Sequence, residues 1–80
     1  MKFDLYSTIM LSRSLPEFGF KKGDVATIVD IIESDKGNGY ILEFFDAQGE
    51  TISVIPVMES NISKPYEHAV VNYRKLAIPA

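Results

Sequence analysis

The chain has 80 residues, of which 46% are hydrophobic and 24% charged, and it contains no cysteine. From this length we expect a single domain, the composition argues against an intrinsically disordered chain, and the lack of thiols excludes disulfides and thiolate metal sites within these residues. The net charge of −3 is unevenly distributed, because residues 30–50 hold six acids and a single base, Lys36. An acidic segment of this kind repels a phosphate backbone, so the charge pattern argues against nucleic acid as the partner.

No targeting or membrane segment is predicted. Residues 1–5 lack an apolar signal-type stretch, and no apolar run reaches the roughly 20 residues that cross a bilayer. Together with the missing cysteines, this pattern predicts a cytoplasmic protein without a membrane partner.

The first predicted strand covers residues 7–11, STIML, which are β-branched and apolar. A long loop follows over residues 15–24, where one proline and two glycines interrupt regular structure. Leu15, Phe18 and Phe20 are too apolar for a simple solvated loop. We expect this loop to fold back over the core.

The next three predicted strands form a meander. Residues 25–32, VATIVDII, are too continuously apolar for a strand with one wet face, so we expect burial on both sides or a strong bend. Residues 34–39, SDKGNG, offer positive φ for a tight hairpin that leads into a strand over residues 40–45. After a turn at residues 46–49, the returning strand over residues 50–55 alternates apolar and polar residues.

The end of the chain is less regular. Pro56 lacks an amide donor, so it should end its strand or lie on an edge, and residues 59–62 predict one helical turn. Residues 68–76 predict a closing strand, with a short helix as the alternative. The pattern therefore favours an all-β fold, a small and strongly bent five-stranded SH3-like barrel over residues 1–66, with a tail over residues 67–80 that packs on the same domain.

A longer pattern supports this fold. It consists of Leu15-Pro16-Glu17, Gly19, Lys22-Gly23-Asp24-Val25 and Thr27-Ile28-Val29, then Tyr40, Glu43-Phe44, Asp46, Gly49-Glu50-Thr51 and Glu59-Ser60-Asn61-Ile62. Over about residues 3–66 it resembles an uncharacterised family of small bacterial proteins, catalogued as a domain of unknown function. The resemblance implies an SH3-like fold and transfers no catalytic residue. Where that family tends to have glycine, this chain has Ala26, which disfavours a bulge there.

The stretch GFKKGDV at residues 19–25 also resembles the ribosomal KOW motif, in which a barrel loop meets RNA. Here only Lys21 and Lys22 are basic, and aromatic stacking platforms and a continuous basic groove are missing, so a solvated loop tip is the preferred interpretation. The alternative is a KOW-like nucleic-acid-binding module that uses Lys21, Lys22, Arg74 and Lys75. That alternative requires the tail to pack beside the first loop.

The remaining motifs favour a structural role over ligand binding or catalysis. Gly37-Asn38-Gly39 opens a strand and not a helix, which favours a hairpin turn over a phosphate cradle. Residues 46–50 lack the distal glutamate of a calcium loop, and His68 is the single histidine, which argues against a histidine-rich metal site and a catalytic triad. We expect no catalytic residue, no metal, no cofactor and no enzymatic activity.

The strand over residues 40–45 carries the strongest functional signal. If Tyr40, Leu42 and Phe44 face the core, alternation turns the intervening side chains outward, two of which are large and apolar. Either the tail covers them through Val71 and Tyr73, or they form a protein-binding or self-association surface. The predicted protein-binding residues are Ile41, Glu43, Phe45, Asp46 and Glu50. We expect a non-enzymatic adaptor, inhibitor, immunity-type or regulatory module that binds another protein and forms a weak homodimer. A basic partner would suit this acidic surface.

Overall fold

The structure is a computed structural model that describes residues 3–71 and 74–76. Five strands follow one another along the chain: β1 (Thr8–Leu11), β2 (Val25–Ile32), β3 (Gly39–Phe45), β4 (Thr51–Met58) and β5 (Ile62–Ser63). Two single turns of 3-10 helix interrupt them, η1 (Pro16–Phe18) and η2 (Glu59–Asn61). The all-β prediction is confirmed, although the sequence predicted one helical turn and missed η1.

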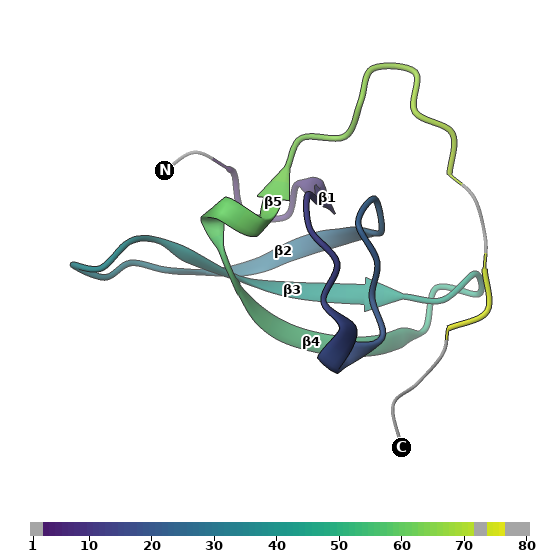
Figure 1. The fold of residues 1–80 in the computed structure, drawn as a ribbon, viewed down its shortest axis with the longest axis horizontal. Helices are drawn as coiled ribbons and strands as arrows, with labels where there is room; N and C mark the ends of the chain where they lie inside the picture. The colour runs from purple at the N-terminus through teal and green to yellow at the C-terminus, as the bar shows by residue number, and fades with distance from the viewer. Residues whose placement is uncertain (1–2, 72–73, 77–80) are drawn as a thin grey trace.

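All five strands belong to one antiparallel sheet with the order β4-β3-β2-β1-β5. Figure 1 shows β4 curving along the lower edge of the sheet. The chain then crosses through η2 and places β5 beside β1. β4 and β5 are therefore the two edges. This order fits the predicted SH3-like barrel, and the SH3-like assignment itself stays a prediction.

The fifth strand differs from its prediction. The closing strand is Ile62–Ser63, and the described residues between 68 and 76 form neither strand nor helix. His68 has a φ of 59°, which takes the backbone out of the extended region. Its neighbours Val70 and Val71, whose β-propensity suggested a strand, are exposed. β-propensity alone did not make these two valines part of a strand, because they have no neighbouring strand and no apolar surface to pack against in the described part of the chain.

The long first loop folds back on the core, as predicted. Leu15 and Phe20 are buried and face each other across an isolated antiparallel bridge, and the Phe20 ring stacks on Phe44 with centroids 3.8 Å apart. Phe18 lies on η1 and is 39% exposed, so its predicted burial is wrong. A single 3-10 turn points successive side chains in different directions, and this one directs Phe18 outward.

Both eight-residue strands, β2 and β4, depart from regular geometry at positions that the sequence had singled out. The pairing of β2 with β3 shifts between Ile28 and Asp30, which places a bulge at Val29 and bends β2, while Ala26 pairs regularly with Ile9. β4 continues through Pro56 to Met58, beyond the predicted end at residue 55. Pro56 is tolerated because β4 is an edge strand, where a missing amide donor breaks no second ladder.

The core lies on one side of β3 and β4 and is apolar throughout the described residues. From β3 it receives Tyr40, Leu42 and Phe44, as predicted. The phenol of Tyr40 donates a hydrogen bond to Oε2 of Glu59 at 2.6 Å and accepts one from the backbone N–H of Phe3 at 3.3 Å. Tyr40 thus fastens both the N-terminal segment and η2 to the central strand.

Candidate protein-binding face

The side of β3 and β4 that faces away from the core presents an apolar surface to solvent. On β3, alternation turns Ile41, Glu43 and Phe45 away from the core, as predicted. In the antiparallel ladder Ile41 is paired with Pro56 and Glu43 with Val54, so these partners share the same side of the sheet. The strand that continues past Pro56 adds Met58 opposite Gly39.

We call the resulting surface the outer patch, and define it as Ile41, Phe45, Val54, Pro56 and Met58. Phe45 is 44% exposed, Val54 53% and Met58 52%, while Pro56 is exposed and Ile41 is half-buried. The alternative that the tail covers Ile41 and Phe45 is not supported by Val71, which is itself 67% exposed. Tyr73, the other residue of that alternative, lies outside the described residues.

Carboxylates surround the outer patch and are held in place. Glu43 accepts a hydrogen bond from the hydroxyl of Thr51, across the β3–β4 ladder. Asp46 accepts backbone N–H bonds from Gln48 and Glu50, both at 2.9 Å, and thereby shapes the hairpin turn. These hydrogen bonds fix the carboxylates in position and leave their negative charge in place.

The structure therefore brings Ile41, Glu43 and Phe45 onto one face and places Asp46 and Glu50 at the hairpin end of that face. It also adds an acid that the sequence did not single out. Asp30 is exposed on β2 and is paired with Ile41 across the β2–β3 ladder, so it borders the opposite side of the outer patch.

The sequence did not predict that residues of β4 would belong to the outer patch. The core-facing residues of β4 are Ile55 and Val57, whereas Ile52 and Val54, which define the apolar alternation in the sequence, are exposed. A register shift between Phe44 and Phe45 separates the pairing near the turn from the pairing of the central ladder. Because a shift of one residue exchanges the two faces of a strand, local alternation could not decide which face is buried.

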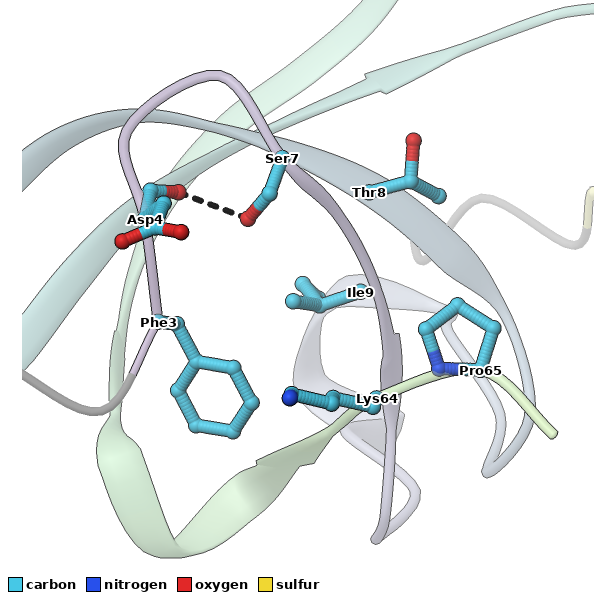
Figure 2. Close-up of a pocket in the computed structure, with 7 residues that line it drawn as sticks. All are labelled: Phe3, Asp4, Ser7, Thr8, Ile9, Lys64 and Pro65. Carbon is cyan, nitrogen blue, oxygen red and sulfur yellow. Dashed lines mark hydrogen bonds between the residues drawn. The ribbon is translucent and has the colours of Figure 1, made fainter.

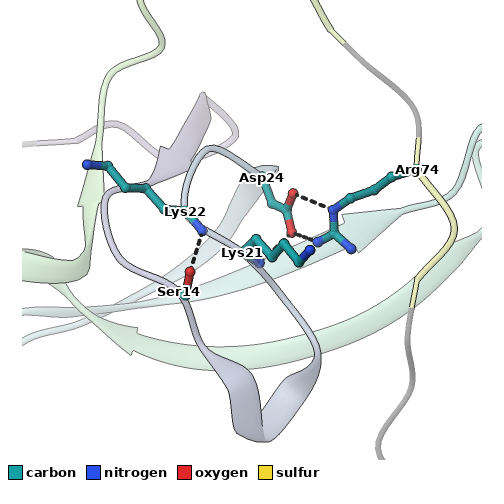
Figure 3. Close-up of polar contacts among 5 residues, drawn as sticks. All are labelled: Ser14, Lys21, Lys22, Asp24 and Arg74. Carbon is teal, nitrogen blue, oxygen red and sulfur yellow. Dashed lines mark hydrogen bonds and ion pairs between the residues drawn. The ribbon is translucent and has the colours of Figure 1, made fainter.

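Three of the four basic residues of the alternative nucleic-acid function, Lys21, Lys22 and Arg74, lie around the turn at residues 21–24 (Figure 3), and the fourth, Lys75, is exposed on the tail. The tail reaches this turn, as that alternative requires, because the guanidinium of Arg74 forms an ion pair with Asp24. The same ion pair offsets the positive charge of Arg74. Figure 3 shows Lys21 on the same side of the turn as Arg74 and Lys22 projecting to the opposite side, so these three basic side chains do not share one side of the turn.

A shallow hollow of about 360 Å³ lies between the N-terminal turn and the segment after β5. Phe3 and Ile9 supply its apolar lining, and Lys64 points across it toward Phe3 (Figure 2). The hydroxyl of Ser7 donates to the backbone carbonyl of Asp4 at 2.6 Å. That hydroxyl therefore helps to shape the turn and is not aligned with a general base.

Residues 3–71 and 74–76 do not assemble a metal site. Within these ranges no three histidine, cysteine, aspartate or glutamate side chains lie close enough together to hold a metal ion. His68 lies beside Glu67 at 3.4 Å, with both side chains 90% exposed. No helix in the described part of the chain has the length and apolar character needed to cross a membrane.

Comparison with known proteins identifies the family of this chain but does not identify an activity. Neither the search of curated proteins nor the search of solved structures found a significant match. The model of the family described as "Domain of unknown function (DUF4926)" matches residues 5–64, which includes all five strands and the whole outer patch. The tail that carries Arg74 lies beyond the match. The chain therefore belongs to the DUF4926 family.

Proposed function

We propose that this protein is a non-enzymatic, cytoplasmic binding module that recognises another protein through the outer patch. The observation that carries the proposal is the exposure of Phe45, Val54 and Met58 on one continuous side of two paired strands. Apolar side chains that gather in this way, with polar groups at their rim, are typical of protein interaction sites.

The charges around the patch support a basic partner. Asp30 lies on one side, and Asp46 and Glu50 lie at the hairpin end. A partner surface with an apolar centre and a rim of lysine or arginine matches this arrangement, because opposite charges steer association and favour the correct register. The basic rim should affect mainly the rate of association, while the apolar centre should set the lifetime of the complex.

The geometry favours docking onto the face of the sheet over addition of a strand to its edge. β4 is an edge strand, but Pro56 lies within it, third from its end, and offers no N–H to an incoming backbone. Strand addition relies on a continuous series of main-chain hydrogen bonds. The partner should therefore contact side chains of the outer patch.

The test begins with identification of the partner by contact. A photoreactive benzophenone amino acid is placed at position 54 of the full chain in cells of the source organism, and at position 71 as the control. Val71 is similarly exposed but lies on the tail, away from the outer patch. We expect position 54 to cross-link a protein that position 71 does not. Equal products at both positions would contradict the proposal.

The partner is then purified and titrated against Val54→Lys and against Val71→Lys as the matched control. A lysine at position 54 removes apolar contact with the partner and repels the basic rim of the partner. The fold should tolerate this lysine, because Glu43 lies opposite it across the β3–β4 ladder. We expect Val54→Lys to weaken binding about tenfold or more, as at an interface hot spot, and Val71→Lys to leave it unchanged. Equal affinities of the two variants would exclude the outer patch as the binding face.

A further inference from the structure

The tail is anchored to the domain at two points that lie outside the matched family region. Arg74 binds Asp24 through two contacts, one from Nη2 to Oδ2 and one from Nε to Oδ1 at 3.3 Å. Two residues later, Leu76 packs against the hydrophobic core cluster. Figure 3 shows the side chain of Arg74 extending from the tail to the Asp24 carboxylate.

The segment that leads to these anchors makes little contact with the domain. Residues 65–71 are exposed, with Val70 at 89%, and contain no strand or helix. In contrast, the side chain of Asp24 is only 24% exposed and that of Arg74 only 32%. Among the described tail residues, one charged contact and one apolar contact, separated by a single residue, thus join the tail to the domain.

The receiving site belongs to the domain itself. Besides binding Arg74, the Asp24 carboxylate accepts the backbone N–H of Lys21 at 2.7 Å, which fixes its direction within the turn. A fixed carboxylate beside an apolar surface is a preorganised receptor, since little side-chain freedom is lost when an arginine binds. The Asp24 turn lies within residues 5–64, whereas Arg74 and Leu76 do not.

We propose that the domain carries a docking site for an extended segment of the form Arg-x-Leu, and that the chain's own tail occupies this site. A segment of this form in another protein competes with the tail for Asp24 and for the apolar surface beneath Leu76. This site is separate from the outer patch, and the proposal does not depend on the proposed function.

The intramolecular contact is tested by trypsin cleavage after Lys75, followed by mass spectrometry on the full chain. Asp24→Asn leaves the tail sequence unchanged and keeps an oxygen for the Lys21 N–H, but it removes the ion pair. We expect cleavage about three- to fivefold faster than in the wild type, because proteolysis follows the population of the open form. Leu76→Ala should accelerate it by about tenfold.

Two matched variants control for general loosening. Glu17→Gln removes an exposed acid from the same loop, and Val70→Ala truncates an exposed apolar residue of the same tail. Both should be cleaved at the wild-type rate. Circular dichroism confirms that each variant is folded. Wild-type cleavage rates in both Asp24→Asn and Leu76→Ala would overturn the intramolecular contact.

The docking site is tested in trans. The full chain with Arg74→Glu and Leu76→Asp releases its tail and is titrated with a synthetic peptide of residues 70–80. With a tenfold preference for the closed form and an effective tail concentration of ~1 mM, the expected Kd is ~0.1 mM. Amide shifts in NMR spectra should move at Asp24 and Val25, and a peptide with the same two substitutions should move neither. Saturating peptide without shifts at the Asp24 turn would overturn the site.

Discussion

Two neighbouring residues of β4 provide a direct test of which face of this strand is buried. Val54 belongs to the outer patch and is 53% exposed, whereas Ile55 points into the core and is 6% exposed. Threonine at either position keeps a β-branched side chain suited to a strand, so the two substitutions differ mainly in the environment that receives the hydroxyl. We expect Val54→Thr to be tolerated and Ile55→Thr to be strongly destabilising.

The expected losses in the free energy of unfolding follow from how deeply each side chain is buried. At position 55 the substitution removes about two buried carbon groups, at ~0.8 kcal/mol each, and places a hydroxyl in an apolar environment for a further cost of ~1–3 kcal/mol. The total loss in free energy of unfolding is about 3 kcal/mol. At position 54 the hydroxyl reaches water, and the loss should stay below about 0.5 kcal/mol. For a domain of this size, these values correspond to reductions in Tm of ~15 °C and ~2 °C.

Thermal melts followed by circular dichroism measure both variants against the wild type, and urea titrations supply the free energies. The urea slope should be unchanged, because neither variant alters the surface exposed on unfolding. If Val54→Thr melted as low as Ile55→Thr, or lower, the register of β4 described above would be wrong. The outer patch would then lose its β4 members.

Three further predictions concern association, stability and the alternative partner. We expect the wild type to form a weak homodimer that Phe45→Asp disrupts without loss of fold; a monomeric wild type in light scattering would exclude the dimer, and a collapsed Tm would place Phe45 in the core. Tyr40→Phe should reduce the free energy of unfolding by about 1.5 kcal/mol, because a hydrogen bond to the Glu59 carboxylate is lost, and an unchanged urea midpoint would contradict this. Fluorescence anisotropy with labelled RNA and duplex DNA at low salt should show no binding; a salt-sensitive affinity lost on Lys21→Glu and Lys22→Glu would favour the KOW-like alternative.

The sequence predicted the elements whose signals are local. The β-branched runs defined β1 and β2, the apolar and aromatic residues defined β3, and the glycine-containing turns on either side of β3 marked both hairpins. At Gly37, with φ of 121°, and at Gly49, with φ of 83°, the backbone adopts conformations that other residues rarely reach. The inward set of β3, Tyr40, Leu42 and Phe44, also followed from alternation alone, because this strand is regular over those residues and lies between two neighbours.

Only the tertiary structure decided three other features. The bulges in β2 and in the β3–β4 ladder set the register, and with it the exposure of Val54 and Met58, because pairing across strands is not encoded in the alternation of either strand by itself. The closing strand became Ile62–Ser63 because η2 delivers it to the free side of β1, where hydrogen bonds were available. The ion pair between Arg74 and Asp24 joins residues fifty positions apart, and such a contact arises only once the sheet has brought the tail and the first loop together.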